Sequence, residues 1–452
     1  MAGIGFALQK LLSSKSLSKK IYAFIIATFI SSGPWLFSMF SLLLVNIFSS
    51  IFFTSDIFLS FRVSVIYVYA FSIICSGPIQ YLLTKYLADQ HYVDNWHKFY
   101  PGLFTAILLQ VAVLTPVIPL WIFLLQGASV IFILGVLFLF FTIIFIWLMM
   151  DFLSASKRYI SIVMAFFIGS GISFGFTMMS AIIFRNENLI IWGFTSGQIV
   201  LFLLLFFFAG RQFPFRLYID RDFLQYLKKY PEFLIIGGAY NAGLWIDKII
   251  FWVFKGRRIV FNYFVYDPYD FMIFIAYLSI IPALALFLLK SETSFFISYH
   301  KFYKSVTKST LGEIEQNYIV MKRDVYKGLL SLIIVQFSSA AVFYFLTQIF
   351  PIFTFCRHLS FQLLGASSFQ ILFLFSLVYL MYFDLRPEAI ICCCTFFSLN
   401  IILNIYSMIN PAFQIGFGYL TATFVSFCLT VFFLRYRLED IVYQIFRKQI
   451  IP

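Results

Sequence analysis

Apolar runs of more than about 18 residues recur from one end of this chain to the other. A helix of that length crosses the ~30 Å hydrocarbon core of a bilayer. Of the 452 residues, 62% are hydrophobic and only 11% are charged, whereas a soluble domain carries roughly a quarter charged residues. Strand-like alternation is missing over such lengths, which argues against a membrane barrel. The chain is therefore predicted to be an all-α polytopic membrane protein.

Charged residues between the apolar runs divide them into about twelve predicted transmembrane helices. The first run follows a basic segment and is too long for the core of a signal peptide, so we expect it to stay as a span. The predicted spans are 21–48, 62–86, 101–126, 128–150, 157–183, 189–210, 231–254, 269–289, 328–348, 360–383, 387–406 and 411–434.

The distribution of basic residues predicts the orientation of these spans. With the N-terminus in the cytosol, most of the 32 lysines and arginines fall at the cytoplasmic ends of the spans, where the positive-inside rule retains them. The chain is therefore expected in the bacterial inner membrane, with both of its termini on the cytoplasmic side. This topology also explains the net charge of +13, and because the charges are spread over many segments no nucleic-acid partner is expected.

Short similar segments, each six spans apart, predict two six-helix lobes related by a pseudo-two-fold repeat. The paired segments are Gly33-Pro34-Trp35 with Gly243-Leu244-Trp245, Gly77-Pro78 with Ile281-Pro282, and Asp151 with Asp384 at the ends of their spans. The predicted parts are a basic cytoplasmic segment (1–20), an N-terminal lobe (21–210), a cytoplasmic linker (211–230), a C-terminal lobe (231–434) with a cytoplasmic amphipathic loop (290–327), and a cytoplasmic tail (435–452).

Charged residues deep in a span are costly and point to function by default. Asp247 and Lys248 lie in the seventh predicted span, and helical spacing places them with Tyr240 and Asn241 on one broad polar stripe. Because lipid cannot satisfy such groups, we expect the stripe to face a wet passage. A static salt-bridge network that holds helices in register is an equally good interpretation. The substrate-path candidates are Trp35, Tyr240, Asn241, Trp245, Asp247 and Lys248.

Glycines and prolines inside the spans form a second group of candidates. A proline within a helix removes a backbone hydrogen bond and kinks the helix. In carriers such breaks act as hinges or expose carbonyls to a cavity, and an ordinary bent helix is the alternative. The hinge or kink candidates are Gly33, Pro34, Gly77, Pro78 and Pro282.

The segment 290–327 is the longest predicted loop. Phe295, Tyr299 and Phe302 follow helical spacing, while Lys301 and Lys304 lie on the opposite side. This pattern predicts an amphipathic helix that lies on the inner leaflet or docks a cytosolic partner.

No motif for chemistry is recognisable. A phosphate-binding G-x-x-x-x-G-K-[ST] loop is missing, and the six cysteines and four histidines lack the spacing of metal ligands. We therefore expect no catalytic residues, no metal and no cofactor, and interpret the chain as a carrier rather than an enzyme.

Several segments together resemble the PelG family of Pel exopolysaccharide transporters, within the exporter superfamily of multidrug, oligosaccharidyl-lipid and polysaccharide carriers (MOP). The segments are Met1-Ala2-Gly3-Ile4-Gly5-Phe6, Ile30-Ser31-Ser32-Gly33-Pro34-Trp35, Leu244-Trp245-Ile246-Asp247-Lys248, Phe295-Phe296 with Tyr299, and Tyr382-Phe383-Asp384-Leu385-Arg386. Gln9-Lys10 departs from the more acidic or arginine-rich character expected there. With the matching position of Asp151, the last segment gives a cytoplasmic loop motif of Asp151, Asp384 and Arg386.

The resemblance implies two six-helix lobes around a V-shaped cavity. It also implies export of an amino-sugar polysaccharide for a biofilm matrix, in a complex with a cytosolic glycosyltransferase and inner-membrane regulatory subunits. Two rival functions stay open within the same superfamily, a flippase for lipid-linked oligosaccharide and a cation-coupled antiporter of small molecules. A membrane glycosyltransferase or acyltransferase would need catalytic carboxylates or a histidine near an aqueous face, and no such constellation is evident in the sequence.

Overall fold

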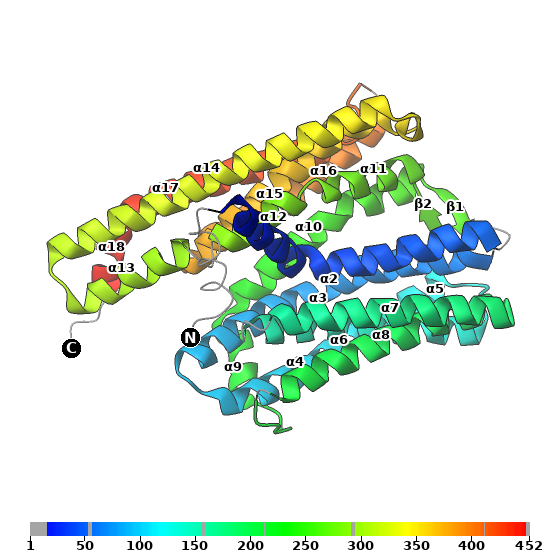
Figure 1. Ribbon diagram of the computed structural model, residues 1–452, viewed down its shortest axis with the longest axis horizontal. Helices are drawn as coiled ribbons and strands as arrows, with labels where there is room; N and C mark the ends of the chain where they lie inside the picture. The colour runs from blue at the N-terminus through cyan, green and yellow to red at the C-terminus, as the bar shows by residue number, and fades with distance from the viewer. Residues whose placement is uncertain are drawn as a thin grey trace. The chain divides into compact units, whose positions relative to one another are not determined.

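The computed structural model describes residues 16–52, 57–155, 159–211, 213–290, 294–410 and 412–448. Within these residues the chain is almost entirely helical (Figure 1). Eleven segments are long and apolar enough to cross a membrane, and the bent N-terminal helix brings the number to twelve. The predicted all-α fold with about twelve transmembrane helices is confirmed.

Contacts divide the chain into two compact units. One unit is Gly33–Asp267, and the other joins Met1–Ser32 to Pro268–Pro452. The boundary between the units therefore does not coincide with the predicted linker 211–230. The seventh span belongs to the first unit by its contacts, and the start of the first span belongs to the second.

The unit Gly33–Asp267 is a helical bundle closed by a short hairpin. Its elements are the second part of α2 (Leu17–Phe52), α3 (Ile57–Tyr92), η1 (Trp96–Lys98), α4 (Phe99–Leu114), η2 (Thr115–Val117), α5 (Ile118–Leu124), α6 (Val130–Ala155), α7 (Tyr159–Phe184), α8 (Glu187–Gly210), α9 (Arg221–Lys229), α10 (Pro231–Lys255), β1 (Arg257–Val260) and β2 (Tyr263–Val265). The two strands pair antiparallel, with Arg257 opposite Val265.

Small residues allow the helices of this unit to approach closely. Gly193 and Gly197 on α8 form a G-x-x-x-G pair that faces α7, where a β-carbon at position 197 would lie 2.2 Å from the Cα of Ser173. Such pairs bring helix backbones into van der Waals contact, which drives association in a bilayer where apolar burial does not. The Ser173 hydroxyl also donates to the Phe194 carbonyl across the same contact.

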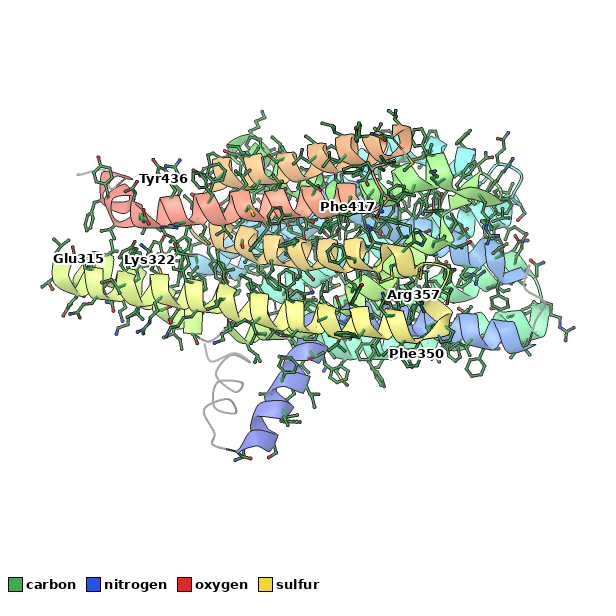
Figure 2. All side chains as sticks on the ribbon, turned by 90° about the horizontal axis from the view of Figure 1, so that it is seen from above. Glu315, Lys322, Phe350, Arg357, Phe417 and Tyr436 are labelled. Atoms are coloured by element: carbon green, nitrogen blue, oxygen red, sulfur yellow. The ribbon has the colours of Figure 1, made fainter. Side chains whose placement is uncertain are left out.

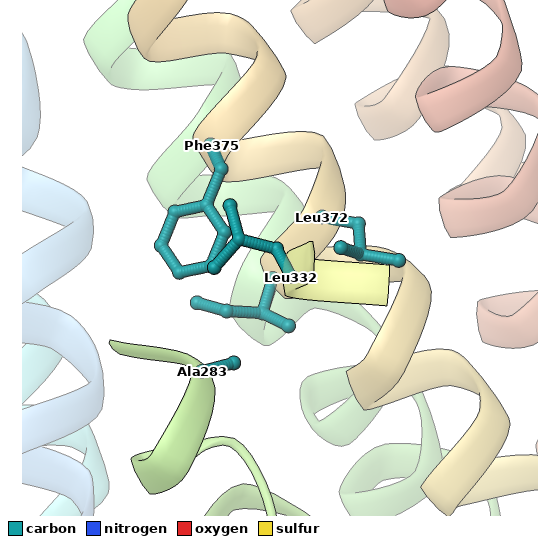
Figure 3. Packing of buried hydrophobic residues seen from close by; sticks show 5 residues of the cluster. Ala283, Leu332, Leu372 and Phe375 are labelled. Atoms are coloured by element: carbon teal, nitrogen blue, oxygen red, sulfur yellow. The ribbon is translucent and has the colours of Figure 1, made fainter. Parts of the chain in front are cut away.

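The other unit is a second helical bundle. Its elements are the first part of α2, α11 (Asp267–Leu278), α12 (Ile281–Lys290), α13 (Phe296–Lys308), α14 (Leu311–Ile349), η4 (Pro351–Phe353), η5 (Arg357–Leu359), α15 (Ser360–Tyr382), α16 (Arg386–Ile409), α17 (Phe417–Glu439) and α18 (Ile441–Lys448). Helices α15 and α16 both pack along α17, and α14 packs along α15. A core cluster of Ala283, Leu332, Ile371, Leu372 and Phe375 joins α12, α14 and α15 (Figure 3).

Helix α14 is much longer than a membrane span. Its 39 residues correspond to about 58 Å, roughly twice the hydrocarbon thickness. Glu315 and Lys322 lie toward one end of the helix, and Phe350 follows the other end (Figure 2). The predicted loop 290–327 is therefore mostly helical, because α13 ends at Lys308 and the first turns of α14 continue without a break into the next span.

Candidate functional site

The polar stripe predicted in the seventh span lies on α10. Pro231 begins this helix, where a missing N–H is harmless, and the chain turns to an extended conformation at Gly256. Asn241, Asp247 and Lys248 are all buried within the protein, with Asp247 0% exposed and Lys248 2% exposed. The charges therefore contact protein and not hydrocarbon, as the cost of a charge in lipid requires.

Asp247 and Lys248 pair with each other although they are neighbours in sequence. The Lys248 Nζ lies 3.2 Å from Asp247 Oδ1 and 3.3 Å from Oδ2, and donates to the Leu244 carbonyl at 2.7 Å. Side chains of adjacent helical residues point about 100° apart, a geometry that does not by itself bring them together. The lysine side chain is long enough to fold back along the helix, so a direct pair forms.

Aromatic rings continue the site along α10. The Lys248 amino group lies 5.4 Å from the Trp245 ring centroid, a cation–π distance. The Trp245 ring lies 6.3 Å from Trp252, and Trp252 stacks on Tyr67 of α3 at 4.5 Å. Tyr240 is also buried. The side chain of Trp35, the remaining path candidate, lies outside the described residues.

Helix α10 crosses α3 at two glycines. A β-carbon at Gly237 would lie 2.3 Å from the Gly77 carbonyl oxygen, and one at Gly77 would lie 2.3 Å from Asn241 Nδ2. Asn241 Nδ2 donates to the Gly237 carbonyl at 3.0 Å. Gly77, predicted as a hinge residue, and Asn241, predicted as a substrate-path residue, thus lie in one contact. Gly77 provides the surface against which α10 packs.

The β1–β2 hairpin fastens the end of α10 to the same unit. The Tyr67 hydroxyl donates to the Phe264 carbonyl at 2.7 Å and accepts from the Phe264 amide at 3.0 Å. The Asn262 amide donates to the Leu124 carbonyl at 3.0 Å. These bonds tie the hairpin that follows α10 to α3 and to the end of α5, so the end of α10 stays in this unit, although the similar segments assigned the helix to the lobe 231–434. Similarity between segments of the two halves carries no information about such contacts.

The three predicted proline breaks differ in structure. Helix α2 is bent by 65° between Ile21–Pro34 and Leu36–Val45. Helix α3 runs through Pro78 without a break. The span with Pro282 is divided into α11 and α12, and Pro282 occupies the first turn of α12.

A serine of a neighbouring helix bonds the backbone at the α11–α12 break. The Ser339 hydroxyl of α14 donates to the Ser279 carbonyl at 2.8 Å. A freed carbonyl at membrane depth needs such a partner, since lipid offers none. The break is therefore built into the packing of α14 against α12.

The loop-motif residues occupy two different environments. Asp151 lies within α6 and not in a loop, and its Oδ2 is buried without a hydrogen bond from a described residue. Asp384 is half-exposed in the turn after α15, with a φ of 55°, and pairs with Arg386 at 3.0 Å. The Leu385 amide donates to the Leu380 carbonyl, and the Asp384 amide to Met381, which is a Schellman motif with aspartate in the glycine position.

Two segments of the PelG resemblance meet at this turn. The Tyr299 hydroxyl of α13 donates to the Tyr382 carbonyl at 3.0 Å, and the Phe295 ring lies 5.2 Å from the Tyr382 ring. Burial, followed by the neighbouring Tyr303 hydroxyl, raises the pKa of Tyr299 above its ordinary value. This aromatic contact anchors α13, while Lys301 and Lys304 remain exposed.

The close helix contacts were missed by sequence reasoning. The G-x-x-x-G spacing of Gly193 and Gly197 was a readable signal for the α7–α8 contact. The Gly77–Gly237 contact had no comparable signal, because its two glycines lie on different helices. In the described part of the chain, no three histidine, cysteine, aspartate or glutamate side chains gather where they could hold a metal.

Solved structures with the same fold are transporters of the MOP superfamily. A MATE transporter in the bent conformation aligns with a TM-score of 0.64 at 13% identity, over 97% of this chain and 98% of that chain. An outward-facing multidrug resistance MATE transporter gives 0.62 at 12% identity, over 96% and 98%. A MOP superfamily transporter from Pyrococcus furiosus gives 0.61 at 12% identity, over 92% and 96%. At these identities the likeness shows the fold alone.

The sequence itself shows the family. A comparison with curated proteins returns no match. The sequence model of the PelG family, described as "Putative exopolysaccharide Exporter (EPS-E)", matches residues 1–446. With a match over nearly the whole length, on a multi-pass helical protein of the MOP transporter fold, the chain belongs to the PelG family of membrane transporters.

Proposed function

We propose that this chain exports a Pel-type amino-sugar polysaccharide from the cytoplasm to the periplasm, across the bacterial inner membrane, for a biofilm matrix. The observation that carries the proposal is the family match over residues 1–446. The MOP transporter fold supports the function of a carrier. The identity of the polymer and the direction of its movement are proposed from membership of the family alone.

The α10 stripe is our proposed part of the polymer path. This stripe supplies both hydrogen-bond donors and acceptors inside a span, from the side chains of Asn241, Asp247 and Lys248. Sugar hydroxyls both donate and accept, so they can replace the Lys248–Leu244 bond without leaving a bare charge. Trp245 beside this pair offers an aromatic face to a sugar ring.

Helix bends are the proposed moving parts. Gly33 and Pro34 interrupt α2 where its contacts change from one unit to the other, and Pro282 begins α12 after a break. Hinge residues of this kind absorb backbone rotation during domain movement. We propose that the two compact units, Gly33–Asp267 and the remainder of the chain, are the parts that move, with the bend at Gly33 and Pro34 at one of their boundaries.

The partners proposed here are a cytosolic glycosyltransferase, inner-membrane regulatory subunits and the lipid of the inner leaflet. Lysines at positions 301, 304 and 308 are exposed on α13, whose other face is buried through Phe302 and Ser305. A helix with one basic and one buried face suits anionic lipid headgroups. The enzyme that polymerises the sugar is then a separate protein, and this chain contributes no catalysis.

A deletion strain tests the export function. We expect it to lose secreted polymer and to accumulate polymer in the cytoplasm, and expression of the chain from a plasmid should reverse both effects. A strain that secretes normally would refute the proposal. Accumulation of a lipid-linked oligosaccharide in the inner leaflet, with no free polymer, would favour a flippase instead.

A further inference from the structure

A surface hollow of about 460 Å³ lies in the unit Pro268–Pro452, far from α10 in sequence. It forms where α14 ends and α15 begins, at the opposite end of α14 from Glu315 (Figure 2). The residues that line it include Tyr344 and Gln348 of α14, Arg357 of the connection, and Ser360, Phe361 and Gln362 of α15. On the predicted topology this end faces the periplasm.

The walls of the hollow combine exposed aromatic rings with planar polar groups. Phe361 is 63% exposed and Tyr344 is 37% exposed, so both rings present faces to the surface. Gln348 Nε2 donates to Ser360 Oγ at 3.1 Å, and Ser360 Oγ donates to the Arg357 carbonyl at 2.7 Å. These bonds hold the polar wall in one arrangement before any ligand arrives.

Arg357 is the charged group of the hollow. Its Nε donates to the Thr347 carbonyl at 3.2 Å, which orients the guanidinium. No carboxylate lines the hollow, and among the described residues Arg357 forms no salt bridge. Its terminal nitrogens can therefore take an acceptor oxygen of a ligand, in the paired geometry that guanidinium favours.

Gln362 supplies an acceptor that the fold leaves unused. Its Nε2 donates to Gln414 Oε1 at 2.9 Å, whereas its own Oε1 is buried and accepts no hydrogen bond from a described residue. A buried acceptor without a donor is costly, and a hydroxyl or amide N–H of a ligand would remove that cost. An ionised phosphate group by itself brings no such donor, whereas a saccharide brings several.

We propose that this hollow is a saccharide-binding subsite, which takes a sugar unit with an acceptor group, an acetamido carbonyl or a carboxylate, against Arg357. The ring stacks on Phe361 or Tyr344, and a hydroxyl or N–H bonds Gln362. Because the described residues that line the hollow include the Arg357 guanidinium and no carboxylate, a protonated free amine is repelled there. The inference rests on the proposed function, since it places on this transporter a site that selects modified units of the exported polymer.

Direct binding to the purified full-length chain in detergent tests the subsite. The probes are a tetramer of N-acetylglucosamine, the same tetramer fully de-acetylated, and a tetramer of galacturonic acid, titrated by calorimetry. We expect the acetylated or the acidic tetramer to bind at least about tenfold more tightly than the free amine. Equal binding of all three, preference for the amine, or no binding of any would each overturn the proposal.

Matched variants locate the binding. Arg357→Gln should weaken binding of the preferred tetramer about tenfold, whereas Lys255→Gln removes an exposed cation elsewhere and should change nothing. Phe361→Leu should weaken it several-fold, and Phe350→Leu, an exposed ring outside the lining, should not. If Arg357→Gln fails to fold, the exposed rings still decide the question, and an unchanged affinity in both Phe361→Leu and Tyr344→Leu would overturn the proposal.

A lipid site is the competing outcome. Arg357-dependent binding of phosphatidylglycerol in nanodiscs, with no saccharide binding, would assign the hollow to a lipid headgroup and overturn the proposal. The assay is independent of export. Loss of binding with intact export would refute only the subsite, and binding in a chain whose deletion leaves secretion normal would refute only the export function.

Discussion

Gly237 and Gly77 bring the backbones of α10 and α3 into direct contact, since a β-carbon at position 237 would lie 2.3 Å from the Gly77 carbonyl oxygen. This contact places the Asn241 side chain beside α3, two turns from the Asp247–Lys248 pair. The position of the polar stripe therefore depends on two residues that have no side chain.

We predict that Gly237→Ala destabilises the protein by about 1–3 kcal/mol, because the added methyl group must push α3 and α10 apart. The control is Gly171→Ala in α7, where an added β-carbon meets nothing within 4 Å. That variant should gain about 0.5–1 kcal/mol from lower backbone entropy in the unfolded chain. Thermal unfolding in detergent measures both, and equal effects would contradict the close contact.

The buried charge pair predicts strong coupling between its two residues. Asp247→Asn and Lys248→Gln should each cost about 3–5 kcal/mol, because each leaves the opposite charge buried without this partner. The double variant should recover most of that loss. Secretion normalised to protein level then separates the two interpretations of the stripe. Normal export by the stable double variant would show that the pair is only structural, and we expect export to be lost.

The α11–α12 break predicts a cost for removing one hydroxyl. Ser339→Ala leaves the Ser279 carbonyl without its donor and should destabilise the protein by about 1 kcal/mol, near the range found for hydrogen bonds in membrane bundles. Ser338→Ala, at the exposed neighbouring position, should stay within about 0.5 kcal/mol of the wild type. Comparable losses in both variants would argue against the bond.

The raised pKa of Tyr299 predicts a specific alkaline destabilisation. The folded protein keeps the phenol protonated while the unfolded chain releases the proton near pH 10, so stability falls as pH rises above that value. Between pH 9 and 11 the wild type should lose about 1 kcal/mol more than Tyr299→Phe. Unfolding temperatures across this pH range measure the difference. Parallel curves for the two proteins would show that Tyr299 does not titrate with unfolding.

Sequence alone determined the number and the apolar character of the spans, because a bilayer demands about 20 apolar residues wherever a helix crosses it. Asp247 and Lys248 were readable for the same reason, since a charge in a span stands out against its cost. Pro282 was readable as a candidate break because a proline ring removes a backbone hydrogen bond, although Pro78 shows that a helix can continue through one. These signals are local, because each can be recognised from the residue type and its immediate neighbours in the sequence.

Tertiary structure decided which helices these residues join. The grouping of α10 with α3 depends on Gly77, Gly237 and the hairpin bonds of Tyr67 to Phe264, which no single segment specifies. The meeting of Tyr299 with the Tyr382 turn, 83 residues later, is equally invisible along the chain. Packing between distant segments depends on shape complementarity, and a sequence pattern records only what each helix presents to its surroundings.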